Sequence, residues 1–225
     1  MKRKHAVRLG VLACASVASL GLITGVSSAA AKSKKKTVTK TATVNQCVNS
    51  ISAILDPGDG VTPAAAVVPI TVPAYRGVPQ TGVVTAINSI GVRITHTFDG
   101  DLGLTLISPS GRLVHLALSP DNLAADNDGG GYGTGAQNCT GSLVQFGDQF
   151  SVSAATPGNT GDEPIVGSLK PLEPLSALVG SQAAGGWTLV VNDNAGTDEG
   201  TLDALSVNLT YQYKALVKKK AKKKK

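Results

Sequence analysis

Residues 94–111 have the sequence Ile-Thr-His-Thr-Phe-Asp-Gly-Asp-Leu-Gly-Leu-Thr-Leu-Ile-Ser-Pro-Ser-Gly, and their pattern decides the class of fold. Large apolar residues alternate here with polar or small ones, which is typical of a β-strand with one buried face. Ser108–Gly111 contains residues that favour a tight turn. We therefore predict strands at residues 92–98 and 102–106, with a turn leading out of the second.

The same alternation recurs on both sides of this stretch. Further strands are expected at residues 69–72, 83–87, 114–118, 143–146, 187–191 and 205–211, which makes about eight strands. The chain contains 26 glycines and 11 prolines, and no stretch keeps apolar residues at helical spacing for three turns. Many short strands with frequent turns predict an all-β fold, a β-sandwich of the jelly-roll kind. Only residues 175–179 favour a helical turn.

The first thirty residues have the pattern of a secretory signal peptide. Basic residues within the first eight positions precede an apolar stretch at residues 9–26, and small residues at 28–31 offer a cleavage site. A permanent membrane anchor is the alternative, but the apolar stretch is short and lysines follow it. We predict that residues 1–30 are removed and that no transmembrane span remains. The protein is then secreted or associated with the cell envelope.

Two cysteines, Cys47 and Cys139, remain after removal of the signal. Export places them in an oxidising compartment, where a pair of cysteines is expected to form a disulfide. On the chain-entropy model, closing a loop of roughly 90 residues contributes about 4–5 kcal/mol to stability. Two free thiols are the alternative.

The charged residues are distributed unevenly. All 15 acidic residues lie between Asp56 and Asp203, and residues 41–213 contain only four basic ones, a balance of 4 − 15 = −11. The positive charge lies in two lysine-rich ends, residues 31–46 and 214–225. Both ends have few large apolar residues, so we predict that they are disordered and flank a folded domain at residues 47–213.

Lysines at this density attract polyanions, with an affinity that depends steeply on salt. The expected partners are an anionic polymer of the cell envelope, an acidic lipid surface or extracellular DNA. The alternative is a solubilising extension without a partner. The C-terminal end has no aromatic residue and no amphipathic pattern, which excludes insertion into a membrane by this segment.

Four motifs occur in a fixed order along the chain. They are the stretch at 94–111, then Pro171-Leu172-Glu173-Pro174-Leu175-Ser176-Ala177-Leu178, then Gly185-Gly186-Trp187-Thr188-Leu189, and finally Asp193, Gly196 and Gly200-Thr201-Leu202. Together they resemble the P domain, or P/Homo B domain, of the subtilisin-like proprotein convertases, over about residues 69–211. The chain departs from the family at Ala204 and Leu205, where an aromatic residue is usual, and keeps only part of an aromatic-acidic cluster at 145–148.

The resemblance implies a jelly-roll sandwich of the galactose-binding-like kind. In convertases the P domain follows a subtilisin-like catalytic domain and stabilises it, and we expect no such catalytic domain within these 225 residues. The favoured function is a non-catalytic binding or structural module at the cell envelope or outside the cell. The alternative is an accessory that stabilises a subtilisin-like serine endopeptidase acting in trans.

The sequence offers no convincing catalytic centre. A Ser-His-Asp hydrolase needs a nucleophile, a base and an orienting acid in contact. His96 falls on the apolar face of its predicted strand, which favours a core histidine, whereas His115 is expected to face solvent. No serine lies in a G-x-S-x-G context, and no Cys/His cluster suits zinc. We therefore expect no enzymatic activity.

Calcium binding is the stronger chemical hypothesis, because this ion prefers six to eight oxygen ligands. Two acidic clusters precede strands, and they comprise Asp99 and Asp101 in the first and Asp193, Asn194, Asp198 and Glu199 in the second. If the clusters adjoin, Asp99, Asp101, Asp193 and Asp198 could share one ion. A separate candidate is Asp126 and Asp128, which resemble the start of a calcium loop that lacks its final glutamate. Turn formation, which Asp and Asn favour anyway, is the alternative for both sites.

Overall fold

The computed structural model describes residues 35–56, 64–72, 82–118, 130–155 and 164–218. The strands are β1 (Lys35–Ile54), β2 (Ala64–Val72), β3 (Val83–His96), β4 (Leu102–Ile107), β5 (Leu113–Ala117), β6 (Val144–Phe146), β7 (Val152–Ser153), β8 (Ser168–Lys170), β9 (Gly185–Asp193) and β10 (Gly200–Lys218). Two short 3-10 helices, η1 (Asp99–Asp101) and η2 (Leu175–Leu178), complete the described elements. None of the described helices has the length and apolar character needed to cross a membrane.

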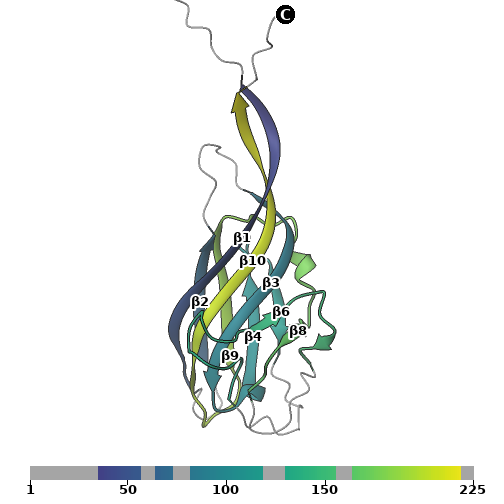
Figure 1. The fold of residues 1–225 in the computed structure, drawn as a ribbon. Helices are drawn as coiled ribbons and strands as arrows, with labels where there is room; N and C mark the ends of the chain where they lie inside the picture. Colours follow the sequence, from purple (N-terminus) through teal and green to yellow (C-terminus); the bar gives the residue numbers. More distant parts are fainter. Residues whose placement is uncertain (1–34, 57–63, 73–81, 119–129, 156–163, 219–225) are drawn as a thin grey trace, which may run out of the picture. The chain divides into compact units, whose positions relative to one another are not determined.

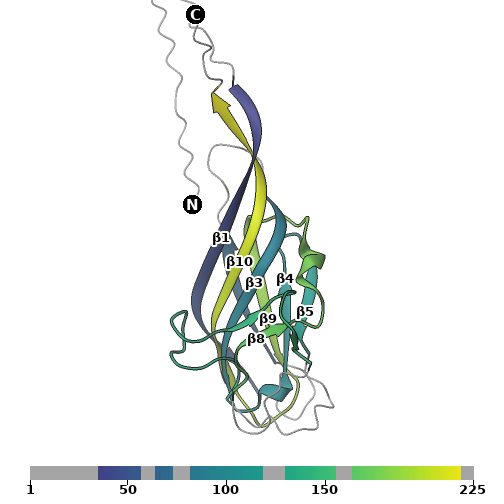
Figure 2. The same cartoon turned by 45° about the vertical axis from the view of Figure 1, so that its right-hand side comes forward.

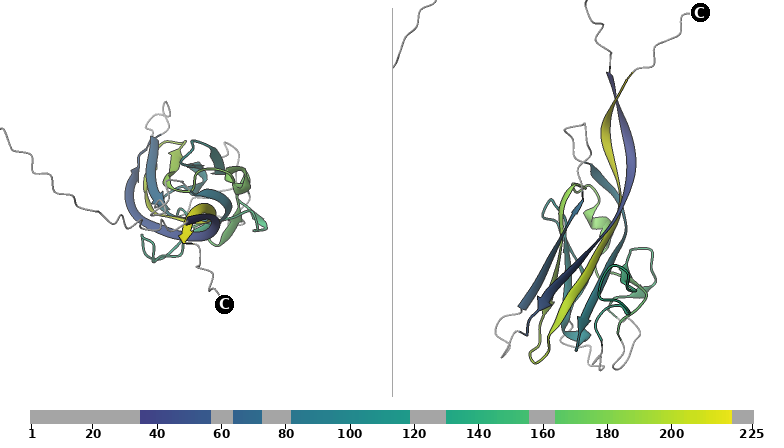
Figure 3. Two further views of the ribbon diagram at one scale, coloured as in Figure 1. Left: turned by 90° about the horizontal axis from the view of Figure 1, so that it is seen from above. Right: turned by 60° about the vertical axis from the view of Figure 1, so that its left-hand side comes forward.

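Two sheets face each other, as the sequence predicts for a sandwich (Figures 1 and 3). One has the order β1-β10-β3-β6-β8-β7 and the other the order β2-β9-β4-β5. Long strands pair antiparallel, and the short β8 runs parallel to both β6 and β7. Because most neighbours, such as β1 and β10 or β2 and β9, are distant in sequence, the fold depends on contacts across most of the described chain.

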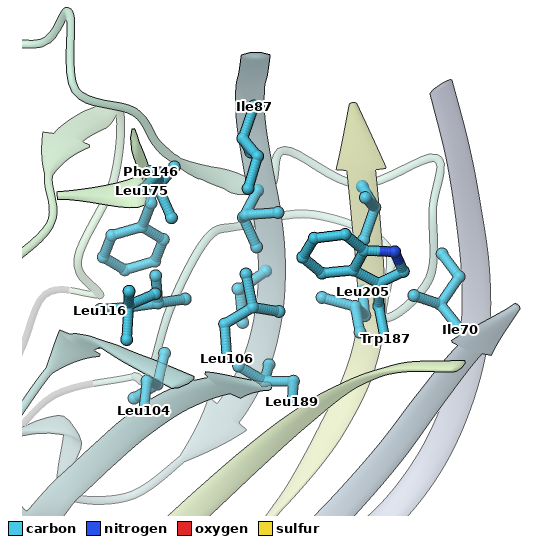
Figure 4. Packing of buried hydrophobic residues seen from close by; sticks show 14 of the residues in the cluster. Ile70, Ile87, Leu104, Leu106, Leu116, Phe146, Leu175, Trp187, Leu189 and Leu205 are labelled. Atoms are coloured by element: carbon cyan, nitrogen blue, oxygen red, sulfur yellow. The ribbon is translucent and has the colours of Figure 1, made fainter. Parts of the chain in front are cut away.

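The core forms where the alternating apolar faces of the two sheets meet. Trp187 on β9 is fully buried among Ile70, Leu189 and Leu205, as Figure 4 shows. Its indole N–H donates a hydrogen bond to the carbonyl oxygen of Ala183 at 3.0 Å, which satisfies its one polar atom. The alternating apolar residues in 102–106 and 187–191 thus form the inward faces of β4 and β9, which confirms the prediction.

The strand boundaries differ from the expectation in two respects. Residues 83–87 and 92–98 were expected as two strands, whereas β3 is continuous from Val83 to His96. The described residues also contain β1, β7 and β8, which the alternation did not predict. The last two are very short, so periodicity has too few residues to act on. The helical turn expected at 175–179 is confirmed as η2.

The prediction that residues 31–46 and 214–225 are disordered is wrong for residues 35–46 and 214–218. They belong to β1 and β10, which pair antiparallel from Lys35 opposite Lys218 through to Ile54 opposite Gly200. Each segment taken alone has too few apolar residues to fold, but paired strands satisfy each other's backbone groups. Threonine and valine are also favourable strand residues. Residues 1–34 and 219–225, which include the predicted signal peptide, lie outside the described residues.

Candidate cation site at the acidic end of the sandwich

The two acidic clusters meet at one end of the sandwich, as the calcium hypothesis requires. Leu102 at the start of β4 pairs with Asp193 at the end of β9. Beyond this pair, the backbone N–H and the side-chain amide of Asn194 both donate to the carbonyl oxygen of Asp101, at 3.1 and 2.9 Å. The strand ends of β3, β4, β9 and β10 therefore form one site, here called the acidic end.

Gly200 allows β10 to begin in close contact with the end of β3. Gly200 pairs with His96 at the end of β3. A Cβ atom at Gly200 would overlap the carbonyl oxygen of Thr95 and press on the ring of His96. Only glycine therefore permits this close approach of the two strands, which gives a physical reason for the Gly-Thr-Leu motif at 200–202.

His96 and Asp193 form a buried pair in this site. The Nε2 atom of His96 lies 3.3 Å from Oδ2 of Asp193, and both side chains are fully buried. The Nδ1 atom of His96 lies 2.8 Å from the carbonyl oxygen of Phe98 and 3.1 Å from its backbone nitrogen. The protonated ring can donate to that carbonyl and the neutral ring can accept from that N–H, so both ring nitrogens have partners in either state.

Asp99 is the unusual residue of the acidic end. It lies in η1 and only 1% of its surface is exposed, yet neither carboxylate oxygen has a hydrogen-bond partner among the described residues. Burial raises the pKa of Asp99 to about 7, and the charge of Asp101 adds to the rise. The backbone N–H groups of Ile165 and Asp99 lower this pKa, although the N–H of Ile165 donates its hydrogen bond to Gly131 at 2.9 Å. Burying a carboxylate without a hydrogen-bond partner is costly, and either a proton or a bound cation would remove that cost.

Burial and electrostatic repulsion raise the pKa values of the neighbouring carboxyl groups, Asp101 and Asp193. Burial raises the pKa of Asp101, and repulsion by Asp193 and Asp198 adds to the rise while His96 opposes it. Burial also raises the pKa of Asp193, against a backbone hydrogen bond from Ala195 and the attraction of His96. The charged groups that act on Asp101 and Asp193 thus include Asp198, which raises both pKa values, and His96, which lowers both, whereas Asp99 is affected by the charge of Asp101.

The four predicted ligands are not equivalent. Asp193 uses Oδ2 for His96 and accepts the N–H of Ala195 on Oδ1 at 3.2 Å. Asp198 accepts the hydroxyl of Thr97 at 2.7 Å. Among the described residues, no three His, Cys, Asp or Glu side chains are arranged to hold a metal ion together. Asp99 differs from Asp193 and Asp198 in that neither of its carboxylate oxygens accepts a hydrogen bond from the described residues. Asp126 and Asp128 lie outside the described residues.

A second buried pair, Arg93 with Asp203, was missed from the sequence. Their side chains lie 3.7 Å apart, and Asp203 also accepts the hydroxyls of Thr95 and Thr201 at 2.7 and 2.6 Å. Alternation places Arg93 on the outward face of β3, which is correct, but that face is covered. The cysteine at position 139 was the available signal, because a disulfide from a loop to β1 requires the loop to cross the sheet.

The covering segment is fixed by the disulfide. Cys47 on β1 is bonded to Cys139, as predicted. Within the same segment Gln137 donates to Thr95 at 2.9 Å, and the N–H of Cys139 donates to Asn49 at 2.7 Å. Tyr132, further back in the segment, exchanges two backbone hydrogen bonds of 2.9 Å with Ile94. Tyr132 therefore pairs beside β3 within the sheet, and residues 134–142 lie over the outer face of the six-stranded sheet near the acidic end.

The other histidine lies on the face of β5 opposite the buried Val114 and Leu116, as expected, but it is only partly exposed. His115 is half-buried rather than open to solvent, and its Nδ1 lies 3.0 Å from the hydroxyl of Thr105. Glu173 is close by, but it accepts the backbone N–H of His115 rather than a ring N–H. Among the described contacts, neither histidine ring is held by a carboxylate on one nitrogen while the other nitrogen faces a serine or cysteine.

Comparison with known proteins gives little further information. No family model matches the chain, and no curated protein matches it. In the crystal structure of the Aeromonas sobria serine protease with its chaperone, a chain matches with 17% identity and a TM-score of 0.40, over 77% of this chain and 27% of that one. In the structure of the Aeromonas sobria serine protease, a chain matches with 15% identity and a TM-score of 0.39, over 76% of this chain and 27% of that one. This chain spans about a quarter of the chains it matches, and similarities this weak establish neither family nor function.

Proposed function

We propose that this chain is an exported, non-catalytic β-sandwich module of the P-domain kind, whose acidic end binds a calcium ion through Asp99. The observation that carries the proposal is the buried carboxylate of Asp99, which has no hydrogen-bond partner among the described residues. The order of the four sequence motifs supports the P-domain assignment. The signal pattern of residues 1–30 supports export, together with the Cys47–Cys139 disulfide.

A divalent cation suits the chemistry of this place. Asp99 has a carboxylate with its oxygens available, and Asp101 adds negative charge two residues away. Hard cations such as calcium take carboxylate, carbonyl and water oxygens as ligands. Asp193 and Asp198 are held by other partners, so we expect them to act through their charge. The role of the ion is then to neutralise buried repulsion and to stabilise the strand ends.

Thermal unfolding of the mature chain in calcium and in EDTA tests this proposal. We expect a higher Tm in calcium, because an ion that binds the folded state stabilises it by mass action. The variant Asp99→Asn should lose the difference. The matched control is Glu199→Gln, which removes the same charge from an exposed neighbouring position. Coincident melts of the wild-type protein in calcium and EDTA would overturn the proposal.

The non-catalytic assignment has its own test. Both nitrogens of His96 are engaged by Phe98 and Asp193, and the ring of His115 contacts only the Thr105 hydroxyl among the described polar contacts. Neither arrangement provides the base that a serine or cysteine nucleophile needs. A casein zymogram of the purified protein should show no clearing. Clearing that a serine-directed inhibitor abolishes would contradict the assignment.

The resemblance to P domains also supports a role beside a protease encoded elsewhere, since that domain stabilises a subtilisin-like catalytic domain in convertases. Affinity purification of the tagged protein from culture medium distinguishes the two roles. Stoichiometric recovery of a subtilisin-like protease would favour the accessory role. Recovery of the module alone, with its calcium response intact, would favour an independent binding or structural role.

A further inference from the structure

Two distant segments form a paired ribbon at the end of the fold opposite to the acidic end. Strand β3 pairs with β10 only as far as Gln212, whereas β1 and β10 continue to pair with each other up to Lys35 and Lys218. Residues 35–40 and 213–218 are therefore joined only to each other by strand pairing, and they are here called the terminal ribbon. Figures 1 and 2 show β1 and β10 running together beyond the other strands.

The terminal ribbon carries a concentrated positive charge. Its five lysines are all exposed, and they are Lys35, Lys36, Lys40, Lys214 and Lys218. No acidic residue occurs in β1, in β3 or in β10 after Asp203. Along β10 the acidic end and the lysines are thus separated by most of one strand. A positive field of this kind attracts a polyanion and not another copy of the same lysine-bearing surface.

Strand pairing arranges the lysines in a defined way. Lys35 lies opposite Lys218, and Lys214 lies opposite Thr39, so these residues share one face, while Lys36 and Lys40 belong to the other. On the first face the ammonium group of Lys214 donates to the Thr39 hydroxyl at 2.7 Å. Alternate residues on one side of a strand are about 7 Å apart. The face thus presents ammonium and hydroxyl donors in a row, which suits anionic groups repeated along a linear chain.

The ribbon has no exposed aromatic side chain to stack on a nucleobase. Tyr211 and Tyr213 belong to the opposite face from Lys214, and each has only 7% of its surface exposed. Proteins that bind single-stranded nucleic acid use exposed aromatic rings as stacking platforms. The donors on the exposed face, ammonium groups and threonine hydroxyls, are those that bind phosphate oxygens.

We propose that the terminal ribbon binds a linear polyphosphodiester without bases, of the glycerol-phosphate type found in envelope polymers, and that binding requires the pairing of β1 with β10. A paired ribbon holds its lysines in place before the polymer arrives, so less conformational entropy is lost on binding than with unpaired segments. This proposal does not depend on calcium at Asp99. The variant Asp99→Asn should bind the polymer as the wild-type protein does, so the two proposals can fail separately.

Calorimetric titration of the mature chain with synthetic poly(glycerol phosphate), at several salt concentrations, tests the proposal. Replacing the five lysines by glutamine should weaken binding by at least about tenfold and flatten the salt dependence, because each phosphate contact contributes to the slope. The double variant Thr37→Pro/Val38→Pro keeps the net charge but breaks the pairing. Successive N–H groups point to opposite sides of a strand, so one of the two prolines removes a hydrogen bond to β10.

The proline variant should also lose at least about fivefold in affinity, since its lysines are no longer held in place. If it fails to fold, Thr37→Gly/Leu216→Gly weakens the same pair of strands more gently. Affinity equal to wild type in a folded variant with a broken ribbon would overturn the proposal, because composition alone would then explain binding. Deletion of residues 219–225 is the control for lysines outside the ribbon, and it should reduce affinity less than the five glutamines do.

Two further titrations test the chemistry of the partner. Single-stranded DNA with the same number of phosphates should bind no more tightly than poly(glycerol phosphate), because the ribbon has no stacking platform. Markedly tighter binding of DNA would overturn the choice of polymer and identify nucleic acid as the partner. Hyaluronate should bind more weakly at matched charge. Equal affinity for this carboxylate polymer would contradict recognition of phosphate.

Discussion

The imidazole of His96 and the carboxylate of Asp193, 3.3 Å apart and fully buried, connect the two sheets of the sandwich. His96 ends β3 in the six-stranded sheet, and Asp193 ends β9 in the four-stranded sheet. The carboxylates of Asp101 in η1 and of Asp198 in the loop before β10 lie near this pair. A polar contact of this kind holds the ends of the two strands together across the sandwich.

Breaking this pair should strongly destabilise the protein. His96→Ala or Asp193→Ala leaves the other group buried without its partner, and we expect either variant to cost about 3–5 kcal/mol of unfolding free energy. The double variant should cost less than the sum of the two single changes, because the orphaned partner is also removed. Urea unfolding of the four proteins measures the coupling. Additive effects would show that the contact contributes nothing specific.

The pKa of Asp99 predicts how stability depends on pH in the absence of calcium. This pKa is about 7 in the folded protein against 3.8 as the ordinary value, so between these values the folded state binds more protons than the unfolded state. Stability contributed by protonated Asp99 is therefore fully present below about pH 4 and is lost as the pH rises to about 7, by at most about 4 kcal/mol. Asp101 and Asp193, whose pKa values are also raised, act in the same direction.

Urea unfolding in EDTA at several pH values measures this effect. Asp99→Asn should flatten the fall in stability between pH 4 and pH 7, because asparagine carries no titrating proton. Glu199→Gln should retain the wild-type profile. A wild-type profile that rises throughout this range would show that Asp99 is ionised and satisfied in the folded protein.

The disulfide should contribute both global and local stability. The bonded cysteines are 92 residues apart, and the chain-entropy model gives about 4–5 kcal/mol for a loop of this size. Cys47→Ser/Cys139→Ser should lose up to this amount in chemical denaturation, and reduction of the wild-type protein should match it. Amide exchange at Thr134 and Ser142, which pair with each other, should accelerate in the variant. Unchanged exchange there would mean that the loop is held without the disulfide.

Asp148 should stabilise the start of η2. Its two carboxylate oxygens accept the backbone N–H groups of Leu175 and Ser176 at 2.7 and 2.9 Å. Asp148→Ala leaves both donors without this partner, and we expect a cost of about 1–2 kcal/mol. Asp148→Asn keeps acceptor capacity and should cost less. Equal losses for alanine and asparagine would indicate that the negative charge, rather than the hydrogen bonds, stabilises the turn.

The sequence predicts the central strands well because alternation reports directly on burial. Ile94, Leu104 and Trp187 were each placed on an inward face, and each is fully buried. The same rule placed His96 correctly in the core. It failed for β1, whose threonine and lysine residues carry little hydrophobic signal. The order of β1 depends on β10, whose paired residues lie between 200 − 54 = 146 and 218 − 35 = 183 positions away in the chain.

The acidic end could be predicted in composition but not in geometry. The motifs brought Asp99, Asp101 and Asp193 together as candidates, and the register of β4 with β9 does place the two clusters side by side. Which carboxylates have spare oxygens depends on hydrogen bonds from Thr97, Ala195 and His96 that spacing does not reveal. The cover over Arg93 likewise depends on the path of residues 130–142, which the cysteine spacing indicates only in outline.

Direct titration of calcium into the mature protein at neutral pH, followed by isothermal calorimetry, tests the central claim about Asp99 most simply. We predict saturable binding of one ion per chain, unchanged in Glu199→Gln and lost in Asp99→Asn. Absence of calcium binding in the wild-type protein, or binding that Asp99→Asn leaves unchanged, would contradict the account of the acidic end.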